Sequence, residues 1–382
     1  MTTLDVAVIG AGIHGASAAY HLASRGVKVA VFDRGMPAGG PTGRSSAVCR
    51  AYYTNEFLAC AARDSIRMMA GFRELTGSDS GYRRTGALFL HPPEDRQQVE
   101  EAVAQLNELG ITTELLEPTE IARRFPHFDL NGIGLGAWEA DAGYADPAGT
   151  TLGLFNRAVE LGAEPRLGRA VTGIEPRGSG ATVVTSDGTT TQADRVLIAA
   201  GPWTRPLVLQ IGVDLPLSVE RHIVGTFRWA TADPMPLHAD IVGGYYFKPE
   251  GQELFLVGPL HSASEADPDD YPEQLIEGEI EELSKAVVRR VPQLSRAEVH
   301  GGWASLYDVS TDWMPVIGEI APGIFVDAGT SGHGFKLAPA LGAHVAAMVM
   351  GEQIPGLEQF HPSRFTGAQT LTAGYGEARI LG

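Results

Sequence analysis

The chain has 382 residues, 44% of them hydrophobic and 20% charged, which is ordinary for a soluble globular protein and long enough for two domains. Its formal net charge of −17 argues against binding to nucleic acid or to an anionic membrane surface, because both attract basic surfaces. A β-type run begins within a few residues of the start, and no apolar run reaches the roughly 18 residues of a membrane span. The cysteines are Cys49 and Cys60 only, so we expect no disulfide framework and a cytoplasmic protein.

Residues 5–15, with the sequence DVAVIGAGIHG, are typical of a dinucleotide-binding turn. The apolar β-branched run at residues 6–9 predicts a buried parallel strand. Gly10 then permits a tight turn, Gly12 lets the backbone approach a pyrophosphate, and Gly15 lets the following helix touch the strand. The unpaired N–H groups at the start of that helix are expected to bind the pyrophosphate.

A second strand is predicted at residues 27–32, and it ends in Asp33, about 20 residues after the glycines, where a carboxylate accepts hydrogen bonds from ribose hydroxyls. The glycine-rich segment that follows predicts a loop. It leads into Arg44, Ser45 and Ser46, whose guanidinium and hydroxyl groups suit phosphate and ring contacts. This order of features, in which a strand, the glycines, a helix and a second strand lead to an acidic residue, favours a nucleotide site over an ordinary βαβ turn.

Periodicity and turn signals predict the remaining elements in chain order. Helices are expected at residues 55–75, 94–109, 117–126, 148–161 and 273–291, and in a short segment capped by Thr204. Strands are expected at residues 86–90, 170–174, 182–186, 189–192, 195–200 and 324–327, and an antiparallel sheet over 215–260. Residues 132–147 are expected to connect two domains, and the chain past residue 365 to be a loose tail.

The chain resembles the flavoproteins that oxidise amines and amino acids, a family that includes sarcosine oxidase, glycine oxidase and D-amino-acid oxidase. The resemblance spans nearly the whole sequence and rests on residues 8–15 with Asp33, and on 43–50, 197–203, 303–318 and 329–336. Its most specific part is SGHGFK, at the end of the last segment, which is similar to the flavin-facing loop of sarcosine oxidase. The resemblance implies that the next helix points its N-terminus at the pyrimidine side of the isoalloxazine, where a reduced flavin gains negative charge.

The resemblance implies an α/β (α+β) fold, in which a Rossmann-like FAD-binding domain joins a second, mostly antiparallel-sheet substrate domain. We expect the FAD-binding domain to be discontinuous, from residues 1–82, 140–212 and 300–365. Residues 83–139 and 213–299 are expected to form the substrate domain, and residues 366–382 the tail. The cofactor is expected to be FAD.

The expected cofactor contacts combine the glycine turn, the loop after Asp33 and the late glycine-rich segment. They are Gly10, Gly12, Ile13, His14, Gly15, Asp33, Arg34, Arg44, Ser45, Ser46, Val171, Gly201, Trp203, Gly332, His333, Gly334, Phe335 and Lys336.

The expected catalytic residues are Arg50, Lys336, Tyr307 and Tyr246. By resemblance, Arg50 and Lys336 match the two cations that hold the substrate carboxylate in sarcosine oxidase, which would fix the α-carbon over the flavin N5. The alternative is that they are two surface cations. Tyr307 and Tyr246 either wall the substrate pocket or pack in the core.

Two histidines, His222 and His261, lie in the predicted substrate sheet, and either could be a base. Lys248 is expected to be a strand-end surface residue. No histidine or carboxylate pattern has the spacing of a metal site.

Two positions depart from the family pattern. Ser305 stands where sarcosine oxidase has the cysteine that tethers its flavin, so we expect FAD to be bound without a covalent link. Phe255 or Leu256 stands where the same enzyme has a lysine that activates oxygen, which favours an electron acceptor other than oxygen.

The sequence therefore predicts an FAD enzyme that removes hydride from the carbon next to an amine nitrogen and gives an imine. Its substrate is expected to be a small amine or amino acid, and nothing in the sequence specifies an oligomeric state. The alternatives are an FAD dehydrogenase with the same chemistry, an NAD-dependent dehydrogenase, and a flavin-binding protein without turnover.

Overall fold

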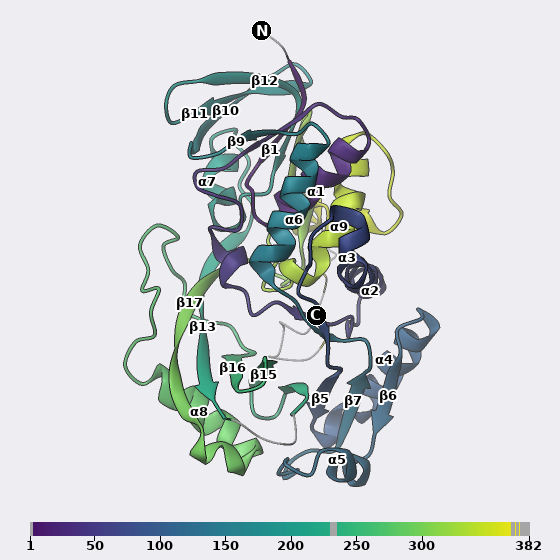
Figure 1. Cartoon of the computed structure of the whole chain (residues 1–382). Helices are drawn as coiled ribbons and strands as arrows, with labels where there is room; N and C mark the ends of the chain where they lie inside the picture. Colours follow the sequence, from purple (N-terminus) through teal and green to yellow (C-terminus); the bar gives the residue numbers. More distant parts are fainter. Residues whose placement is uncertain (1–2, 230–234, 368–370, 372–373, 375–382) are drawn as a thin grey trace.

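The computed structural model describes residues 3–229, 235–367, 371 and 374. Within them the chain forms two eight-stranded sheets and one three-stranded sheet. Figure 1 shows the first large sheet with most of the helices in the upper part of the molecule, and the second large sheet in the lower part.

The first large sheet has a parallel centre in which β2, β1, β12 and β19 are neighbours in that order. Its strands are β1 (Leu4–Ile9), β2 (Val29–Phe32), β9 (Glu164–Arg166), β10 (Val171–Arg177), β11 (Gly180–Thr185), β12 (Thr190–Ile198), β18 (Val316–Ala321) and β19 (Ile324–Ala328). Val6 and Val8 are fully buried in β1, so the predicted buried parallel strand is confirmed. The short edge strand β9 pairs in parallel with β2.

Most of the longer helices of the upper part pack beside this sheet (Figure 1). They are α1 (Ile13–Ser24), α2 (Glu56–Ala70), α3 (Phe72–Thr76), α6 (Pro147–Glu160) and α9 (Gly334–Val349), while the short α7 (Thr204–Leu209) follows β12. A Cβ at Gly342 of α9 would lie 2.2 Å from Ser17 Oγ of α1. The two helices therefore approach closely because glycine stands at their crossing.

The second large sheet is antiparallel except where β14 pairs with β5. In spatial order its strands are β17 (Glu298–Ser310), β13 (Leu217–Arg228), β16 (Leu254–Pro259), β15 (Tyr245–Glu250), β14 (Leu237–Asp240), β5 (Ala87–His91), β7 (Leu135–Glu139) and β6 (Thr113–Leu116). Around it lie α4 (Arg96–Glu108), α5 (Pro118–Arg124) and α8 (Glu279–Arg290), and the small sheet consists of β3 (Val48–Cys49), β8 (Gly143–Tyr144) and β4 (Arg83–Arg84). The predicted fold class, with one Rossmann-like and one mostly antiparallel sheet, is confirmed.

Several local predictions were wrong. Residues 132–147 are more than a connection, because they contain β7, which hydrogen-bonds between β5 and β6. Residues 189–192 and 195–200 belong largely to one strand, β12, and not to two. Thr204 begins α7 and does not cap it, since Trp203 holds the N-cap position. The helix expected at residues 55–75 is broken at Gly71.

The division into domains stays a prediction. The sheets follow it broadly, but residues 300–310, assigned to the FAD-binding part, belong to β17, which pairs along its length with β13 of the second sheet. The predicted tail, residues 366–382, falls mostly outside the described residues.

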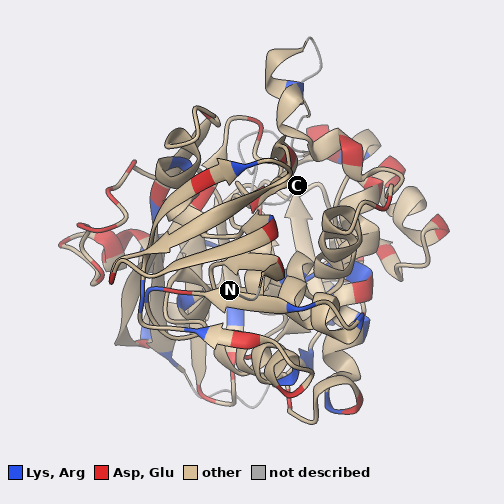
Figure 2. Cartoon of the chain, turned by 90° about the horizontal axis from the view of Figure 1, so that it is seen from above, with Lys and Arg blue, Asp and Glu red and all other residues tan. Residues whose placement is uncertain are grey.

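Both acidic and basic segments are scattered over the face seen from above (Figure 2). In the part of the chain that the structure describes, no helix is both long and apolar enough to cross a membrane. Cys49 and Cys60 are both free thiols.

Candidate active site

The turn between β1 and α1 can be built only with glycines. Gly10 has φ +108°, and a Cβ there would lie 2.2 Å from the carbonyl oxygen of Ala199. A Cβ at Gly15 would lie 1.9 Å from the carbonyl oxygen of Gly10. Gly12 is the N-cap of α1, with no side-chain cap and no acidic residue in the first turn. The N-terminus of α1 therefore offers backbone N–H groups to an anion.

Asp33 fixes this turn from the end of β2. Its Oδ2 accepts a hydrogen bond from the backbone N–H of Ala11 at 2.7 Å, and its Oδ1 accepts one from Gly35 at 2.7 Å. The carboxylate keeps further lone pairs for a ribose, as expected of an acid in this position.

A cavity of about 780 Å³ extends from this turn to the second sheet. The expected cofactor and catalytic residues that line it are Gly10, Gly12, Ile13, His14, Asp33, Arg34, Arg44, Ser45, Ser46, Val171, Gly201, Trp203, Tyr246, Tyr307, Gly332, Gly334 and Phe335. Gly15, Arg50, His333 and Lys336 were expected there and do not line it. Gly15 instead packs beneath Gly10, and the ring of His333 is buried against the hydroxyl of Tyr53.

Two expected arginines lie at the outer part of the cavity and are held by acids from the loop after β16. The Arg34 guanidinium stacks on the Trp203 ring, 3.8 Å from its centroid, and pairs with Asp269. Arg44 pairs with Glu273. Both ion pairs are solvent-exposed and therefore worth little to stability.

The inner part of the cavity has an aromatic wall formed by the second sheet. The rings of His222 on β13 and Tyr307 on β17 are stacked with centroids 3.9 Å apart, and Tyr246 on β15 also lines the cavity. Gly332, just before α9, lies against Tyr307, because a Cβ there would be 2.6 Å from the ring. The N-terminus of α9 and the aromatic wall thus face the same space.

The titrating groups of this wall are perturbed by burial. Burial lowers the pKa of His222, although the nearby Glu220 opposes the shift. Burial raises the pKa of Tyr246 to about 12 and that of Tyr307 further. At neutral pH, His222 is neutral and both phenols keep their protons.

Of the two ring nitrogens of His222, one is hydrogen-bonded to a carboxylate and the other finds no hydrogen-bond partner among the described residues. Its Nε2 lies 3.0 Å from Glu220 Oε2, so the carboxylate selects the tautomer with the proton on Nε2. Among the described residues, its buried Nδ1 and the buried hydroxyl of Ser305, directly opposite on β17, have no hydrogen-bond partner. His261, the other histidine considered as a base, is exposed and lies outside the cavity lining.

Arg50 and Lys336 are buried and close enough to influence each other. They are 3% and 6% exposed, so they are not surface cations. The Lys336 ammonium donates to the carbonyl oxygen of Gly332 at 3.4 Å, and Arg50 donates to that of Tyr52 at 2.5 Å. Burial, and then the charge of Arg50, hold the pKa of Lys336 well below its usual range. Lys336 is thus tied to Gly332, which lines the cavity.

Two charged residues near this pair were missed or misjudged from the sequence. Glu139, at the end of β7, is fully buried, and its carboxylate accepts hydrogen bonds from the backbone N–H of Ala51 at 2.8 and 3.0 Å. Lys248 is 3% exposed and not on the surface, with its ammonium 4.4 Å from the centre of the Tyr144 ring and paired with Glu250. Sequence periodicity carried no signal for either, because the burial of each depends on contacts with distant segments: Glu139 with Ala51, and Lys248 with Tyr144 of β8.

Among the described residues no group of three or more His, Cys, Asp or Glu side chains is arranged to hold a metal ion.

Comparison with known proteins identifies the family of the chain. The model of the FAD dependent oxidoreductase family (DAO) matches residues 5–348. The chain belongs to this family. The NAD-dependent alternative is thereby set aside.

FAD dependent oxidoreductases similar to this chain include human mitochondrial dimethylglycine dehydrogenase, 26% identical over 98% of this chain and 46% of that protein. Glycine oxidase of Bacillus licheniformis is 28% identical over 92% of this chain and 94% of that protein. The chain spans about half the length of the dimethylglycine dehydrogenases that it matches. The crystal structure of L-proline dehydrogenase from P. horikoshii shares the fold, with a TM-score of 0.86 at 24% identity over 95% of this chain and 98% of that one.

The residues of the cavity fit the FAD of this family. The glycine turn and the α1 N-terminus suit a pyrophosphate, and Asp33 suits a ribose. Three residues of the cavity wall, Asp327, Ser305 and His222, each have a buried polar atom that finds no partner within the part of the protein that the structure describes. Such atoms indicate a polar ligand, because buried polar groups in folded proteins are hydrogen-bonded.

Proposed function

We propose that this chain oxidises the carbon–nitrogen bond of an amine or amino acid, passing hydride to FAD and releasing an imine that water hydrolyses. The observation that carries the proposal is the cavity that joins the glycine turn of β1–α1 to the aromatic wall facing the α9 N-terminus. The glycine turn and Asp33 would hold the nucleotide part of FAD, and Tyr246, Tyr307 and Gly332 are the residues available to its redox ring. When bound, FAD supplies the hydride acceptor.

Tyr246, Tyr307 and His222 are the proposed substrate-facing residues. The two phenols stay neutral and form a wall that positions a carbon–hydrogen bond and excludes water. An amine must lose its ammonium proton before it gives up hydride. The open Nδ1 of His222 carries the lone pair that could accept this proton, because Glu220 takes the hydrogen bond from Nε2.

Arg50 and Lys336 are the proposed partners of a substrate carboxylate. A carboxylate bound beside them would pair with the Arg50 guanidinium and would favour the charged form of Lys336, against the burial and the Arg50 charge that lower the pKa of that lysine. Neither side chain reaches the cavity as it stands, so the proposal requires the wall at Gly332 to open toward them when substrate binds. The names of the relatives, dimethylglycine dehydrogenase and glycine oxidase, support an amine next to a carboxylate.

The second candidate is a dehydrogenase that passes electrons to an acceptor other than oxygen. Phe255 and Leu256, where the family resemblance expected a lysine, are buried apolar residues of β16. No cation stands at either position, although Lys248 is the cross-strand neighbour of Leu256.

We also propose that FAD is held without a covalent bond and that the protein is cytoplasmic. Ser305 lines the cavity where a tethering cysteine was expected from the resemblance, and a serine hydroxyl does not form the thioether. The two free thiols support a reducing compartment.

The proposal is tested by mixing the purified protein without oxygen with a panel of primary and N-methylated amino acids, simple amines and 2-hydroxy acids. Bleaching of the flavin absorption band by an amino acid, with release of the matching keto acid or aldehyde, is the expected result. The His222→Asn variant should reduce its flavin more slowly, whereas the exposed His261→Asn serves as the matched control. Bleaching by 2-hydroxy acids alone would refute carbon–nitrogen oxidation.

A further inference from the structure

Asp327 and His14 form a buried ion pair in the wall of the cavity. Asp327 is the penultimate residue of β19 and is 2% exposed. His14 lies in the first turn of α1 and is 8% exposed. His14 Nδ1 lies 2.8 Å from Asp327 Oδ2, and His14 Nε2 lies 3.1 Å from the carbonyl oxygen of Gly334. Both ring nitrogens face acceptors, so both carry protons and the imidazole is a cation.

The electrostatics agree with this geometry. Burial lowers the pKa of His14, but the charge and hydrogen bond of Asp327, joined by the charge of Asp308 and the hydrogen bond to Gly334, outweigh burial and raise the pKa above its ordinary value. The pair is therefore neutral as a whole. A lone carboxylate here would repel the negative charge that the α1 N-terminus is built to receive.

The pair leaves one carboxylate oxygen unused. Within the described part of the chain, the buried Oδ1 of Asp327 has no hydrogen-bond partner. An ionised carboxylate only accepts hydrogen bonds, and a buried acceptor without a donor is unfavourable. The donor must come from something that occupies the cavity.

The position of Asp327 indicates which part of the cofactor this is. Asp327 stands at the C-terminal edge of the parallel strands, with β12 between its own strand and β1. His14 joins Asp327 to α1, whose N-terminus suits a pyrophosphate, and Gly334 joins His14 to α9, whose N-terminus faces the aromatic wall that would receive the redox ring. In FAD the ribityl chain, which carries hydroxyl donors, links these two ends.

We propose that Asp327 is a cofactor-recognition residue whose Oδ1 accepts a hydrogen bond from a ribityl hydroxyl of FAD, and that His14 is the positioning residue that orients and neutralises its carboxylate. The proposal rests on FAD as cofactor and is independent of the bond that the protein oxidises.

Asp308 provides a matched control, since it is a second buried acid of the cavity wall. Its carboxylate is already occupied, by the backbone N–H of Gly329 at 2.7 Å and the hydroxyl of Thr330 at 3.0 Å. Asp308 therefore shares the location and burial of Asp327 without an open oxygen.

The test measures flavin affinity and does not use turnover. The full chain, produced without flavin in riboflavin-starved cells, is titrated with FAD, with FAD analogues that each lack a single ribityl hydroxyl, and with an N3-methyl analogue, while tryptophan fluorescence is followed. The wild type should bind one deoxy analogue about 10- to 100-fold more weakly than FAD. Asp327→Ala should bind FAD and that analogue equally, whereas Asp308→Asn should keep the wild-type ratio.

Equal binding of FAD and every deoxy analogue by the wild type would overturn the proposal, and this arm needs no variant to fold. A loss confined to the N3-methyl analogue would assign Oδ1 to the ring and not to the ribityl chain. If Asp327→Ala still binds FAD more tightly than the deoxy analogue by the wild-type ratio, another residue holds the hydroxyl. Asp327→Asn replaces the alanine variant in this measurement if that variant does not fold.

Discussion

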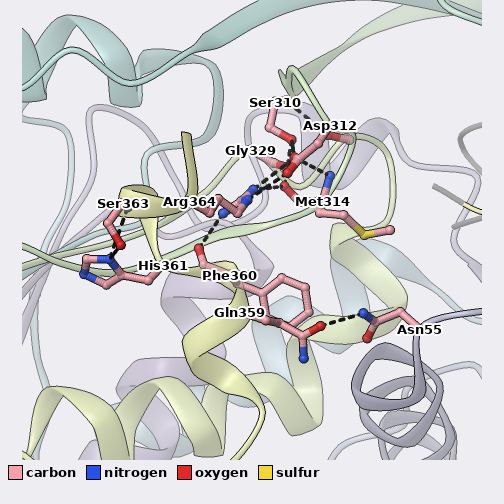
Figure 3. Close-up of polar contacts among 11 residues, drawn as sticks. Asn55, Ser310, Asp312, Met314, Gly329, Gln359, Phe360, His361, Ser363 and Arg364 are labelled. Carbon is pink, nitrogen blue, oxygen red and sulfur yellow. Dashed lines mark hydrogen bonds and ion pairs between the residues drawn. The ribbon is translucent and has the colours of Figure 1, made fainter. Parts of the chain in front are cut away.

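The Asp312 carboxylate and the Arg364 guanidinium form an ion pair that is shielded from water, with Oδ2 and Nε 2.7 Å apart and neither side chain more than 6% exposed (Figure 3). Arg364 also donates to the carbonyl oxygens of Phe360 at 2.6 Å and Met314 at 3.0 Å. The pair therefore fastens the segment after α9 to the turn between β17 and β18.

Replacing Arg364 with methionine should lower the free energy of unfolding by about 3–5 kcal/mol, because it leaves the Asp312 carboxylate buried without its partner. Urea unfolding of the FAD-loaded protein measures the change. Arg205→Met, which breaks an exposed pair with Asp214, is the control and should change stability by less than about 1 kcal/mol. Similar values for the two variants would contradict the structural role assigned to Arg364.

Arg50→Ala and Lys336→Ala should each lower kcat/KM for the true substrate by roughly 30-fold or more, since truncating one member of a desolvated charged contact typically costs about 2–5 kcal/mol. The flavin should stay bound in both variants. Lys285, an exposed lysine of α8, is the control, and Lys285→Ala should behave as wild type. Wild-type kinetics in both Arg50→Ala and Lys336→Ala would mean that the substrate carboxylate binds elsewhere or that the substrate has no carboxylate.

Glu139 should make stability fall as the pH rises. Burial raises its pKa to about 7 from 4.5, so between these values the folded state binds more protons than the unfolded state, and the free energy of unfolding decreases with pH. Glu139→Gln removes this dependence, because the amide does not titrate. The stability of wild type relative to Glu139→Gln should decline from about pH 4.5 to 7, by on the order of 3 kcal/mol, and then level off.

Urea unfolding at a series of pH values checks the Glu139 prediction. The exposed Glu253→Gln is the control for the loss of a carboxylate without burial. A relative stability of Glu139→Gln that does not vary over this pH range would show that Glu139 is charged throughout.

Acid or heat precipitation should release yellow FAD into the supernatant, because Ser305 offers no thiolate to tether it. Absorbance of the clarified supernatant measures the released flavin against the total. Colour that stays with the denatured pellet would establish a covalent link and show that another residue provides it.

Air should reoxidise the reduced protein more slowly than an artificial acceptor dye does. A fixed cation near the flavin stabilises the negative charge that develops as oxygen is reduced, and Phe255 and Leu256 supply none. Stopped-flow mixing of the reduced protein with oxygen or dye gives both rates. Fast reoxidation by air that is lost in Lys248→Met would instead assign the role of that cation to Lys248.

The sequence by itself determined the β1–α1–β2 unit, its glycines, Asp33 and the late glycine-rich turn into α9. Each of these features depends on a short stretch of sequence. The apolar run of β1 leads directly into Gly10, whose φ of +108° favours glycine, and Asp33 directly follows β2. Most of the residues expected to contact the cofactor do line the cavity for this reason, although their contact with FAD remains a prediction.

Only the tertiary structure decided which distant residues meet. The strand β7 was missed because its place between β5 and β6 comes from pairing and not from its own glycine-rich sequence. The burial of Lys248 and Glu139 was missed because neighbouring elements cover them. His14 and Asp327 are 313 positions apart in the chain, so no spacing along the sequence reveals that the two side chains form a hydrogen bond. Their ion pair exists because parallel strands and two helix ends converge on the same edge of one sheet.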